Sequence, residues 1–316
     1  MGFSNRQERL IWSATPTPFL KGEVDAVAVE KMIEHHFRSG VDGIFLAGTC
    51  GEGPWMREQH FRDLLRMSVQ ATGGRFPLAA NITSNSAEQA LDKARIAQEA
   101  GVDLVIISGP FFLINATPEN LLRFYLKVVE ASPLPVGFYD LGKHQRYFLP
   151  EEQLKEIYQH PKIKWVKDSS GDPVRQKIAL QARDSRPELR LMNGNEFDCV
   201  NYLKSGYDGL MLGGAIFNAP MAQRLIDALE DANEVLAEEI QNRMNELMWK
   251  VYGSKDLHCW LTGLKYLLIK MGIFSTTESF LHFPLNEETK SAIDQIFEDD
   301  PEKYFADLYP QAVESL

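Results

Sequence analysis

Three short apolar segments of this chain each lead into residues that could act on a carbonyl compound. One segment ends in Lys167, a second ends in Tyr139, and the third runs into the turn 48–52, whose sequence is GTCGE. A lysine amine can attack a carbonyl carbon, and a phenol can move protons. A glycine-bearing turn can present backbone N–H groups to a carboxylate. Together these groups make up a Schiff-base site.

None of these features is specific when taken alone. A lysine after a strand is most often a solvated charge, and a buried tyrosine is most often a core ring with a satisfied hydroxyl. The apolar approach to Lys167 through Trp165 and Val166 changes this interpretation, because at the mouth of a barrel it would remove water from the amine and favour the uncharged nucleophile. Tyr139 ends the preceding strand and would stand beside that amine.

Other residues follow the same strands and could line a pocket. His144, with Lys143 beside it, follows Tyr139 and could meet the distal end of a substrate, although an exposed loop histidine is an equally good interpretation. Gly194 follows the seventh strand of the series given below, where a glycine permits close approach of a ligand, and Met211 belongs to the eighth strand; we assign both residues to the pocket wall. The pair His35-His36 lies inside the first helix and is predicted to have no functional role.

Composition limits the classes of protein to consider. The 316 residues are 44% hydrophobic and 24% charged, and the formal net charge is −11, which argues against a nucleic-acid-binding surface. We find neither a signal-peptide pattern nor an apolar run long enough for a membrane span. Cys50, Cys199 and Cys259 lie far apart, so the sequence predicts neither a disulfide framework nor a metal site. We expect a soluble cytoplasmic enzyme.

Apolar runs alternate with segments of helical period, which is typical of a parallel sheet built from βα units. The sequence predicts eight strands, at residues 10–14, 43–46, 77–81, 104–108, 136–139, 163–167, 189–193 and 209–212. It predicts helices that begin near Asp25, Arg57, Ser86, Thr117, Pro150, Pro173, Glu196 and Ala219. Eight of each predict a closed (β/α)₈ TIM barrel, whose active site lies at the carboxyl ends of the strands.

A local phrase recurs along the chain and marks the boundaries of the units. Gly40, Gly101 and Gly206 each follow a helical segment and precede an acidic residue and the next strand. After the eighth unit, helical patterns continue at residues 231–252, 256–271 and 287–297. We therefore predict a barrel over residues 7–232 and a C-terminal helical appendage over residues 233–316.

The motifs at these positions resemble the superfamily of dihydrodipicolinate synthase and N-acetylneuraminate lyase, which are class I aldolases. The likeness covers nearly the whole chain, and the combination of motifs is specific although each piece is weak. It rests on the segment TPTPF at 15–19, GTCGE at 48–52, Tyr139 in a Y-N-x-P position, and KDSS at 167–170.

The resemblance implies roles for individual residues. Lys167 would form an imine with a 2-oxo acid such as pyruvate, Tyr139 would be the proton shuttle, and Thr49 with Gly48 and the Cys50 backbone would hold the carboxylate. No metal or other cofactor is needed, because the protonated imine is itself the electron sink. Family members are commonly tetramers or dimers, so we expect a homo-oligomer that binds a small-molecule substrate and neither nucleic acid nor membrane.

Departures from the family motifs narrow the expectation. Cys50 replaces a Ser or Thr, Phe112 replaces the tyrosine of the synthase proton relay, Gly142 replaces a proline, and Lys143-His144 stand where the synthase has an arginine. The neuraminate lyase pattern after strand seven is absent as well. The sequence thus predicts a divergent member that acts on another 2-oxo acid.

Three hypotheses remain open at this point. The first is an aldolase that cleaves or forms pyruvate plus an aldehyde. The second is a dehydratase of a 2-keto-3-deoxy sugar acid that uses the same lysine imine, with His144 assisting departure of the hydroxyl. The third, of another class, is a barrel that only binds a 2-oxo acid. Retention of both Lys167 and Tyr139 argues against the third, since a binding protein needs no nucleophile.

Overall fold

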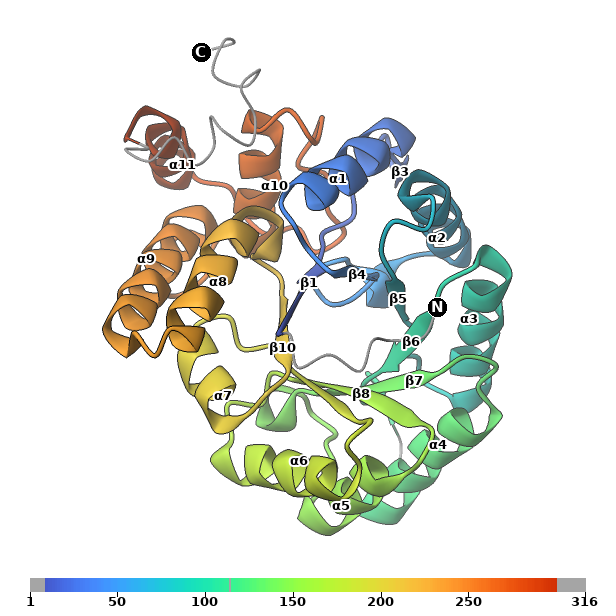
Figure 1. The fold of residues 1–316 in the computed structure, drawn as a ribbon. Coiled ribbons are helices and arrows are strands. Elements are labelled where there is room, and N and C mark those ends of the chain that lie inside the picture. The colour runs from blue at the N-terminus through green and yellow to red at the C-terminus, as the bar shows by residue number, and fades with distance from the viewer. Residues whose placement is uncertain (1–8, 114, 300–316) are drawn as a thin grey trace.

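Eight parallel strands close into a barrel at the centre of the molecule, and helices surround it (Figure 1). The computed structural model describes residues 9–113 and 115–299. Around the barrel the strand order is β1-β10-β9-β8-β7-β6-β5-β4, and β1 closes the ring by pairing with both β10 and β4. The strands are β1 Leu10–Ala14, β4 Gly43–Leu46, β5 Leu78–Asn81, β6 Leu104–Ile107, β7 Val136–Asp140, β8 Ile163–Asp168, β9 Arg190–Asn193 and β10 Gly209–Leu212.

The predicted (β/α)₈ fold is confirmed, and each observed strand lies within one residue of its predicted bounds at either end. The short antiparallel hairpin of β2 (Phe19–Leu20) and β3 (Glu23–Val24) was not predicted, because two-residue strands leave no periodic signal. The barrel helices are α1 Ala26–Arg38, α2 Glu58–Thr72, α3 Ala87–Ala100, α4 Pro118–Ala131, α5 Glu151–Gln159, α6 Pro173–Ser185, α7 Cys199–Ser205 and α8 Ala215–Glu230.

Two predicted starts of barrel helices are wrong. Helix α7 begins at Cys199 and not near Glu196, whose carboxylate is instead used to accept a hydrogen bond from the Gly214 amide at 2.6 Å. Helix α8 begins four residues before the predicted Ala219, so that Pro220 lies inside it. A proline within a helix leaves the carbonyl four residues earlier without its usual donor. Here that carbonyl belongs to Ile216.

The repeated glycine and acidic residues join the amino ends of neighbouring units. Gly101 and Gly206 end helices with φ of 90° and 110°, in the left-handed region that favours glycine. The carboxylates of Asp42, Asp103 and Asp208 accept hydrogen bonds from amides of the first or second residue of a neighbouring strand, at 2.7 to 2.9 Å. The recurring acidic residue therefore holds the amino end of a neighbouring strand in place.

Large side chains fill the interior of the barrel below the site. The Trp12 and Trp165 rings meet there with centroids 4.7 Å apart, and Met192 and Met211 pack in the same cluster. All four side chains are buried. This layer closes the floor beneath Tyr139, so the barrel is a packed core and not a pore.

The chain continues beyond the barrel into three helices, of which the first packs against α8 and the other two pack against the first (Figure 1). These are α9 Glu234–Tyr252, α10 Trp260–Lys270 and α11 Glu287–Asp299. Helix α10 begins at Trp260, four residues later than the pattern from Asp256 indicated. The division of the chain at residue 232 stays a prediction, and residues 7, 8, 114 and 300–316 of the two ranges lie outside the described residues.

The histidine pair in α1 has a structural role that its sequence did not reveal. The His35 ring donates from Nε2 to the Ile216 carbonyl, the group that Pro220 leaves without a helical donor. His36 donates from Nδ1 to the Met32 carbonyl at 2.7 Å and accepts at Nε2 from Ser13 at 2.8 Å. Burial lowers the pKa of His35 to about 4 and that of His36 to about 3.

We expect this pair to make the fold acid-labile. Below pH 6.5 the two histidines become protonated in the unfolded chain but stay neutral in the folded protein, because their folded pKa values are lower. The free energy of unfolding therefore decreases as the pH falls, by up to about 1.4 kcal/mol per pH unit for each ring. His36→Gln should therefore flatten the decrease in unfolding free energy between pH 6.5 and 4, measured by urea titration. The exposed His258→Gln serves as the control. An unchanged slope in the His36 variant would contradict this account.

Candidate active site

Lys167 and Tyr139 face each other across adjacent strands at the carboxyl end of the barrel. Strands β7 and β8 pair in a register that sets Tyr139 opposite Lys167. The Lys167 Nζ atom lies 4.4 Å from the centroid of the Tyr139 ring and 5.2 Å from that of Phe45. The structure thus brings together the amine and the phenol that the sequence singled out.

The Lys167 side chain is only 6% exposed. Within residues 9–113 and 115–299 its amine has no hydrogen bond or ion pair, and its contacts are aromatic faces. Lys265, which is also buried, forms an ion pair with Glu52. An amine without a counter-ion can approach a carbonyl carbon, whereas an amine in an ion pair is already engaged by its carboxylate. Of these two buried lysines, Lys167 is therefore the one whose amine has no counter-ion among the described residues.

The turn after β4 presents free amides at the same end of the barrel. It closes on itself through the Glu52 amide, which bonds to the Thr49 carbonyl at 3.1 Å, and the Gly53 amide, which bonds to the Gly48 carbonyl at 3.2 Å. In the described part of the chain the amides of Thr49 and Cys50 have no acceptor. Successive unpaired N–H groups form a nest for an anion.

Crowding forces the shape of this turn. A Cβ atom at Gly53 would lie 1.8 Å from the Ala47 carbonyl oxygen, so only glycine fits there. Ala47 and Glu52 both have positive φ, at 53° and 60°, a conformation that is strained for residues with a side chain. Thr17 donates from its hydroxyl to the Gly51 carbonyl at 2.7 Å and braces the turn from the β1 side.

Gly194 makes room for the nucleophile. A Cβ atom there would lie 2.8 Å from Lys167 Cε and 2.1 Å from Ser169 Oγ. The Ser169 hydroxyl is buried without a hydrogen-bond partner among the described residues, beside the Lys167 chain. Ser169 belongs to the motif KDSS at 167–170, and the sequence predicts no separate role for it. The position of the Ser169 hydroxyl beside Lys167 can be recognised only when β8 and β9 are placed side by side.

Gly194→Ala should therefore displace Lys167. We expect the rate of imine formation to fall by about 10²-fold, the typical effect of moving a reacting atom by about 1 Å. The measurement is the rate of borohydride trapping with pyruvate, together with the melting temperature. Gly213→Ala provides the comparison, because its methyl group would meet no atom closer than 3.7 Å. Equal rates in the wild type and the Gly194 variant would disprove the steric argument.

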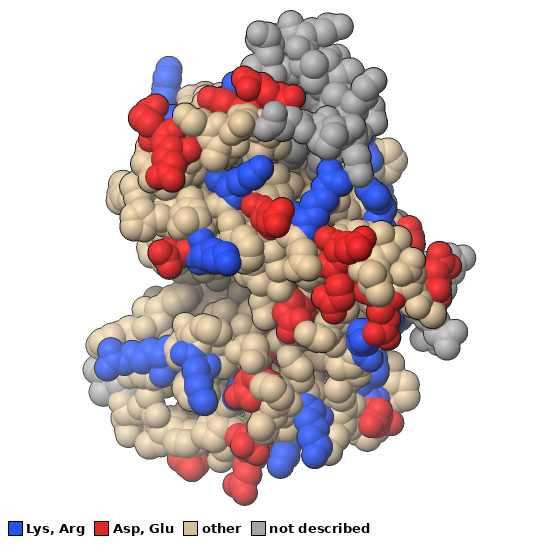
Figure 2. Space-filling model, turned by 90° about the vertical axis from the view of Figure 1, so that its left-hand side faces the viewer, with Lys and Arg blue, Asp and Glu red and all other residues tan. Residues whose placement is uncertain are grey.

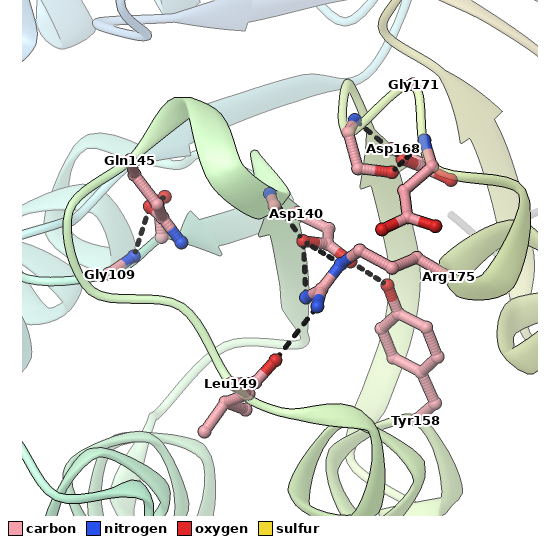
Figure 3. A network of polar contacts seen from close by, with 12 residues as sticks. Gly109, Asp140, Gln145, Leu149, Tyr158, Asp168, Gly171 and Arg175 are labelled. Atoms are coloured by element: carbon pink, nitrogen blue, oxygen red, sulfur yellow. Dashed lines mark hydrogen bonds and ion pairs between the residues drawn. The ribbon is translucent and has the colours of Figure 1, made fainter.

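A buried polar network supports the strands behind the site (Figure 3). Because side chains alternate along a strand, Asp140 and Asp168 point away from the barrel interior. Arg175 donates to Asp140 from Nη2 at 2.7 Å and to the Leu149 carbonyl at 2.8 Å, and Tyr158 donates to Asp140 at 2.8 Å. These residues hold the end of β7 and with it Tyr139.

Asp168 anchors the end of β8 in the same way. It accepts from the Tyr207 hydroxyl at 2.5 Å and from the Ser170 amide at 2.8 Å. Burial raises the pKa of Asp168 to about 6, and the nearby Asp140 carboxylate adds to this effect. The carboxyl group next to Lys167 in sequence is therefore a structural anchor of the turn and does not face the amine.

A second acidic group lies inside the mouth of the barrel. Glu196 is half-buried, and burial raises its pKa, while the hydrogen bond from the Gly214 amide acts in the opposite direction. Burial also raises the pKa of the Cys50 thiol, with the Glu196 charge as the next cause. Cys50 is thus a neutral thiol that can offer its backbone but no thiolate.

The remaining predicted pocket residues lie at different depths. His144 and Lys143 are exposed on the short helix Gly142–His144 after β7. Phe112 is 64% exposed, and its amide bonds to Asn85 at 2.9 Å. Met211 is fully buried in the floor below the site. Contacts of these residues with a substrate stay predictions.

The neighbouring residue Gln145 was missed and ties the loop after β7 to the end of β6. Its Oε1 atom accepts from the Ser108 hydroxyl at 2.9 Å and from the Gly109 amide at 3.3 Å (Figure 3). Sequence alone gave no reason to prefer Gln145 over His144, because both lie in one polar loop. The hydrogen bonds distinguish the side chain that packs inward from the exposed one.

Three general features of the described residues complete the description of the molecule. Within residues 9–113 and 115–299, no group of three or more His, Cys, Asp or Glu side chains is arranged around a metal position. No helix in these ranges has the length and apolar character to cross a bilayer. On the face shown in Figure 2, basic and acidic side chains are interspersed, without the one-sign stripe typical of nucleic-acid binders.

Residues 7–299 match the model of the dihydrodipicolinate synthetase family. The chain belongs to this family. A 4-hydroxy-tetrahydrodipicolinate synthase of Kosmotoga olearia is 28% identical over 283 residues, which cover 88% of this chain and 92% of the relative. One from Nitrobacter hamburgensis is 25% identical over 256 residues, or 81% and 86% of the two chains. As a member of the dihydrodipicolinate synthetase family, the protein is a lyase of the class I aldolase type.

Solved structures of other proteins share the fold. YagE of E. coli K12, solved in complex with pyruvate, aligns with a TM-score of 0.81 and 19% identity over 92% of this chain and 97% of YagE. CdNal of Clostridium difficile, solved with mannosamine, aligns with a TM-score of 0.83 and 19% identity over 92% and 98% of the two chains. At this identity the likeness concerns the architecture of the barrel.

Proposed function

We propose that the protein is a Schiff-base-forming lyase that acts on a 2-oxo acid, with Lys167 as the nucleophile and Tyr139 as the proton shuttle. The observation that carries the proposal is the pairing of these two residues across β7 and β8, with the buried, unpaired amine 4.4 Å from the phenol ring centroid. The pyruvate in the YagE complex supports the choice of a 2-oxo acid.

The residues suggest a complete sequence of steps. The carboxylate of the substrate accepts from the free amides of Thr49 and Cys50, and the Lys167 amine attacks C2 and expels water to form a protonated imine. Tyr139 removes the proton from the C4 hydroxyl, the C3–C4 bond breaks, and its electron pair moves into the imine to give an enamine and an aldehyde. Protonation at C3 and hydrolysis then release pyruvate and the free lysine.

The same imine also allows dehydration of a 2-keto-3-deoxy sugar acid. In this case a proton leaves C3 and a hydroxide leaves C4 with an added proton. The buried, unpartnered Ser169 hydroxyl beside Lys167 favours a substrate that bears a hydroxyl near the imine carbon, a requirement that aldol cleavage and dehydration share. His144, the acid expected for this route, lies exposed on its loop. We therefore place aldol cleavage first.

Three measurements test the proposal. Borohydride added with pyruvate should inactivate the enzyme and add one pyruvyl unit to its intact mass, and no added mass would refute the imine. A panel of 4-hydroxy-2-oxo acids and 2-keto-3-deoxy sugar acids should then release pyruvate. Loss of water without pyruvate would instead establish the dehydratase. A Lys167→Ala variant that binds the same ligand with unchanged affinity would favour the non-catalytic binding protein.

We also propose that the enzyme works as a homo-oligomer, either a dimer or a tetramer, without a metal or another cofactor. The exposed Phe111 and Phe112, at 48% and 64%, are large apolar side chains of the kind that subunit contacts cover. Light scattering coupled to size-exclusion chromatography measures the assembly, and activity after extensive chelation tests the metal. A monomer at micromolar concentration would contradict the first statement.

A further inference from the structure

A buried ion pair joins the anion-binding turn to the C-terminal helices. The Lys265 ammonium in α10 lies 2.5 Å from the Glu52 carboxylate, and both side chains are fully buried. The two residues are 213 positions apart in the sequence. A buried pair is retained only with good geometry and further hydrogen bonds, because removing two charges from water is costly.

Those further hydrogen bonds come from the same C-terminal segment. Glu52 also accepts from the Ser279 hydroxyl at 2.9 Å and from the Phe280 amide at 2.6 Å. Lys265 also donates to the Glu278 carbonyl at 2.5 Å, and its ammonium lies 4.9 Å from the centroid of the Phe19 ring. The three partners of the Glu52 side chain, Lys265, Ser279 and Phe280, therefore all lie in α10 or in the loop that follows it.

The backbone of Glu52 belongs to the turn that carries the free amides. Its amide closes the turn onto the Thr49 carbonyl at 3.1 Å, and its φ of 60° is one that a residue with a side chain adopts only under constraint. The pair with Lys265 supplies a constraint from outside the barrel. Loss of the pair would let the peptide at Glu52 relax, and the amides of Thr49 and Cys50 would change direction with it.

We propose that Glu52 and Lys265 are positioning residues for the substrate carboxylate, so that the C-terminal helical segment forms part of the binding site for the 2-oxo acid. This inference rests on the proposed function, because it assumes that the turn 48–52 holds that carboxylate. The inference adds that the affinity for the substrate carboxylate depends on the Glu52–Lys265 ion pair, which lies behind the turn and does not contact the substrate.

The test compares a charged ligand with an uncharged one. For Glu52→Gln and Lys265→Met, imine formation is followed by borohydride trapping as a function of the concentration of pyruvate and of pyruvamide, which keeps the ketone but lacks the carboxylate. We expect half-saturation for pyruvate to rise by about tenfold or more, the usual cost of a lost hydrogen bond to a charged group. The value for pyruvamide should change little.

Controls separate positioning from general loss of stability. Lys270→Met removes a second ion-paired lysine of α10, which lies 3.1 Å from Asp294 and is partly exposed, and it should leave both values unchanged. If the two main variants fail to fold, Ser279→Ala removes a single donor to Glu52 and should raise the pyruvate value about threefold without affecting pyruvamide. Melting temperatures accompany every measurement.

The possible outcomes are distinct. A folded Glu52 or Lys265 variant that loses both ligands by the same factor, or loses neither, overturns the positioning role and leaves the imine mechanism intact. The same holds for an equal loss in Ser279→Ala. A wild-type protein that traps neither ligand overturns the proposed function, and the positioning role falls with it.

Discussion

Replacing Tyr139 by phenylalanine is expected to slow proton transfer at C3 of bound pyruvate by about 10²- to 10⁴-fold, the usual contribution of a positioned acid or base. The ring would remain, with its contacts to Lys167 and its edge-on packing against Phe45 at 6.2 Å between centroids. The change therefore removes the hydroxyl and keeps the shape of the site.

The exchange of the pyruvate methyl protons for deuterium, followed by NMR in heavy water, measures this step without knowledge of the second substrate. Tyr266→Phe is the control, because it removes a phenol hydroxyl that bonds to Asp294 in the C-terminal helices. Exchange at the wild-type rate in the Tyr139 variant would assign the proton shuttle to another group.

Replacing Arg175 by methionine is expected to lower the free energy of unfolding by about 3 to 5 kcal/mol, because it leaves the Asp140 carboxylate buried without its countercharge. The side chains of Arg175 and Asp140 are 5% and 0% exposed. Since Asp140 directly follows Tyr139 at the end of β7, the same variant should also lose activity.

Urea unfolding at pH 7 measures this loss. Arg183→Met is the matched variant, since Arg183 lies in the same helix and pairs with Asp208 at 2.8 Å but is 24% exposed. We expect a smaller loss there, as is usual for partly solvated pairs. If both variants lose the same free energy of unfolding, burial of the Arg175–Asp140 pair does not add to its contribution, and this account is contradicted.

The sequence predicted the barrel and the central pair of the site because both depend on local order. Each strand is a short apolar run with clear ends, and Lys167 and Tyr139 close consecutive strands that must be neighbours in a parallel barrel. The alternation of strands and helices along the chain, together with the strand order, was therefore enough to predict that these two side chains lie close together at the carboxyl end of the barrel.

What the sequence did not predict depends on contacts between distant segments. The pairing of Glu52 with Lys265 and that of Arg175 with Asp140 carry no local pattern. The place of Pro220 inside α8 could not be foreseen, because the chain alone does not show that His35 satisfies the freed carbonyl of Ile216.

The sequence also did not predict which loop side chains are buried and which are exposed. His144 and Gln145 are neighbours in a polar loop, yet the first is exposed and the second bonds to Ser108. The unpartnered Ser169 hydroxyl became visible only when Gly194 was placed against it. Such positions follow from how loops pack over the barrel and not from residue type.

The most direct test of the account is to locate the adduct after borohydride reduction with pyruvate. The chain is digested and the pyruvyl group is mapped by tandem mass spectrometry. Lys167 and Lys265 are both buried, but only Lys167 lies beside Tyr139 without an ion pair in the described structure. We predict that Lys167 carries the group. An adduct on Lys265 or any other lysine, with Lys167 unmodified, would contradict the central claim.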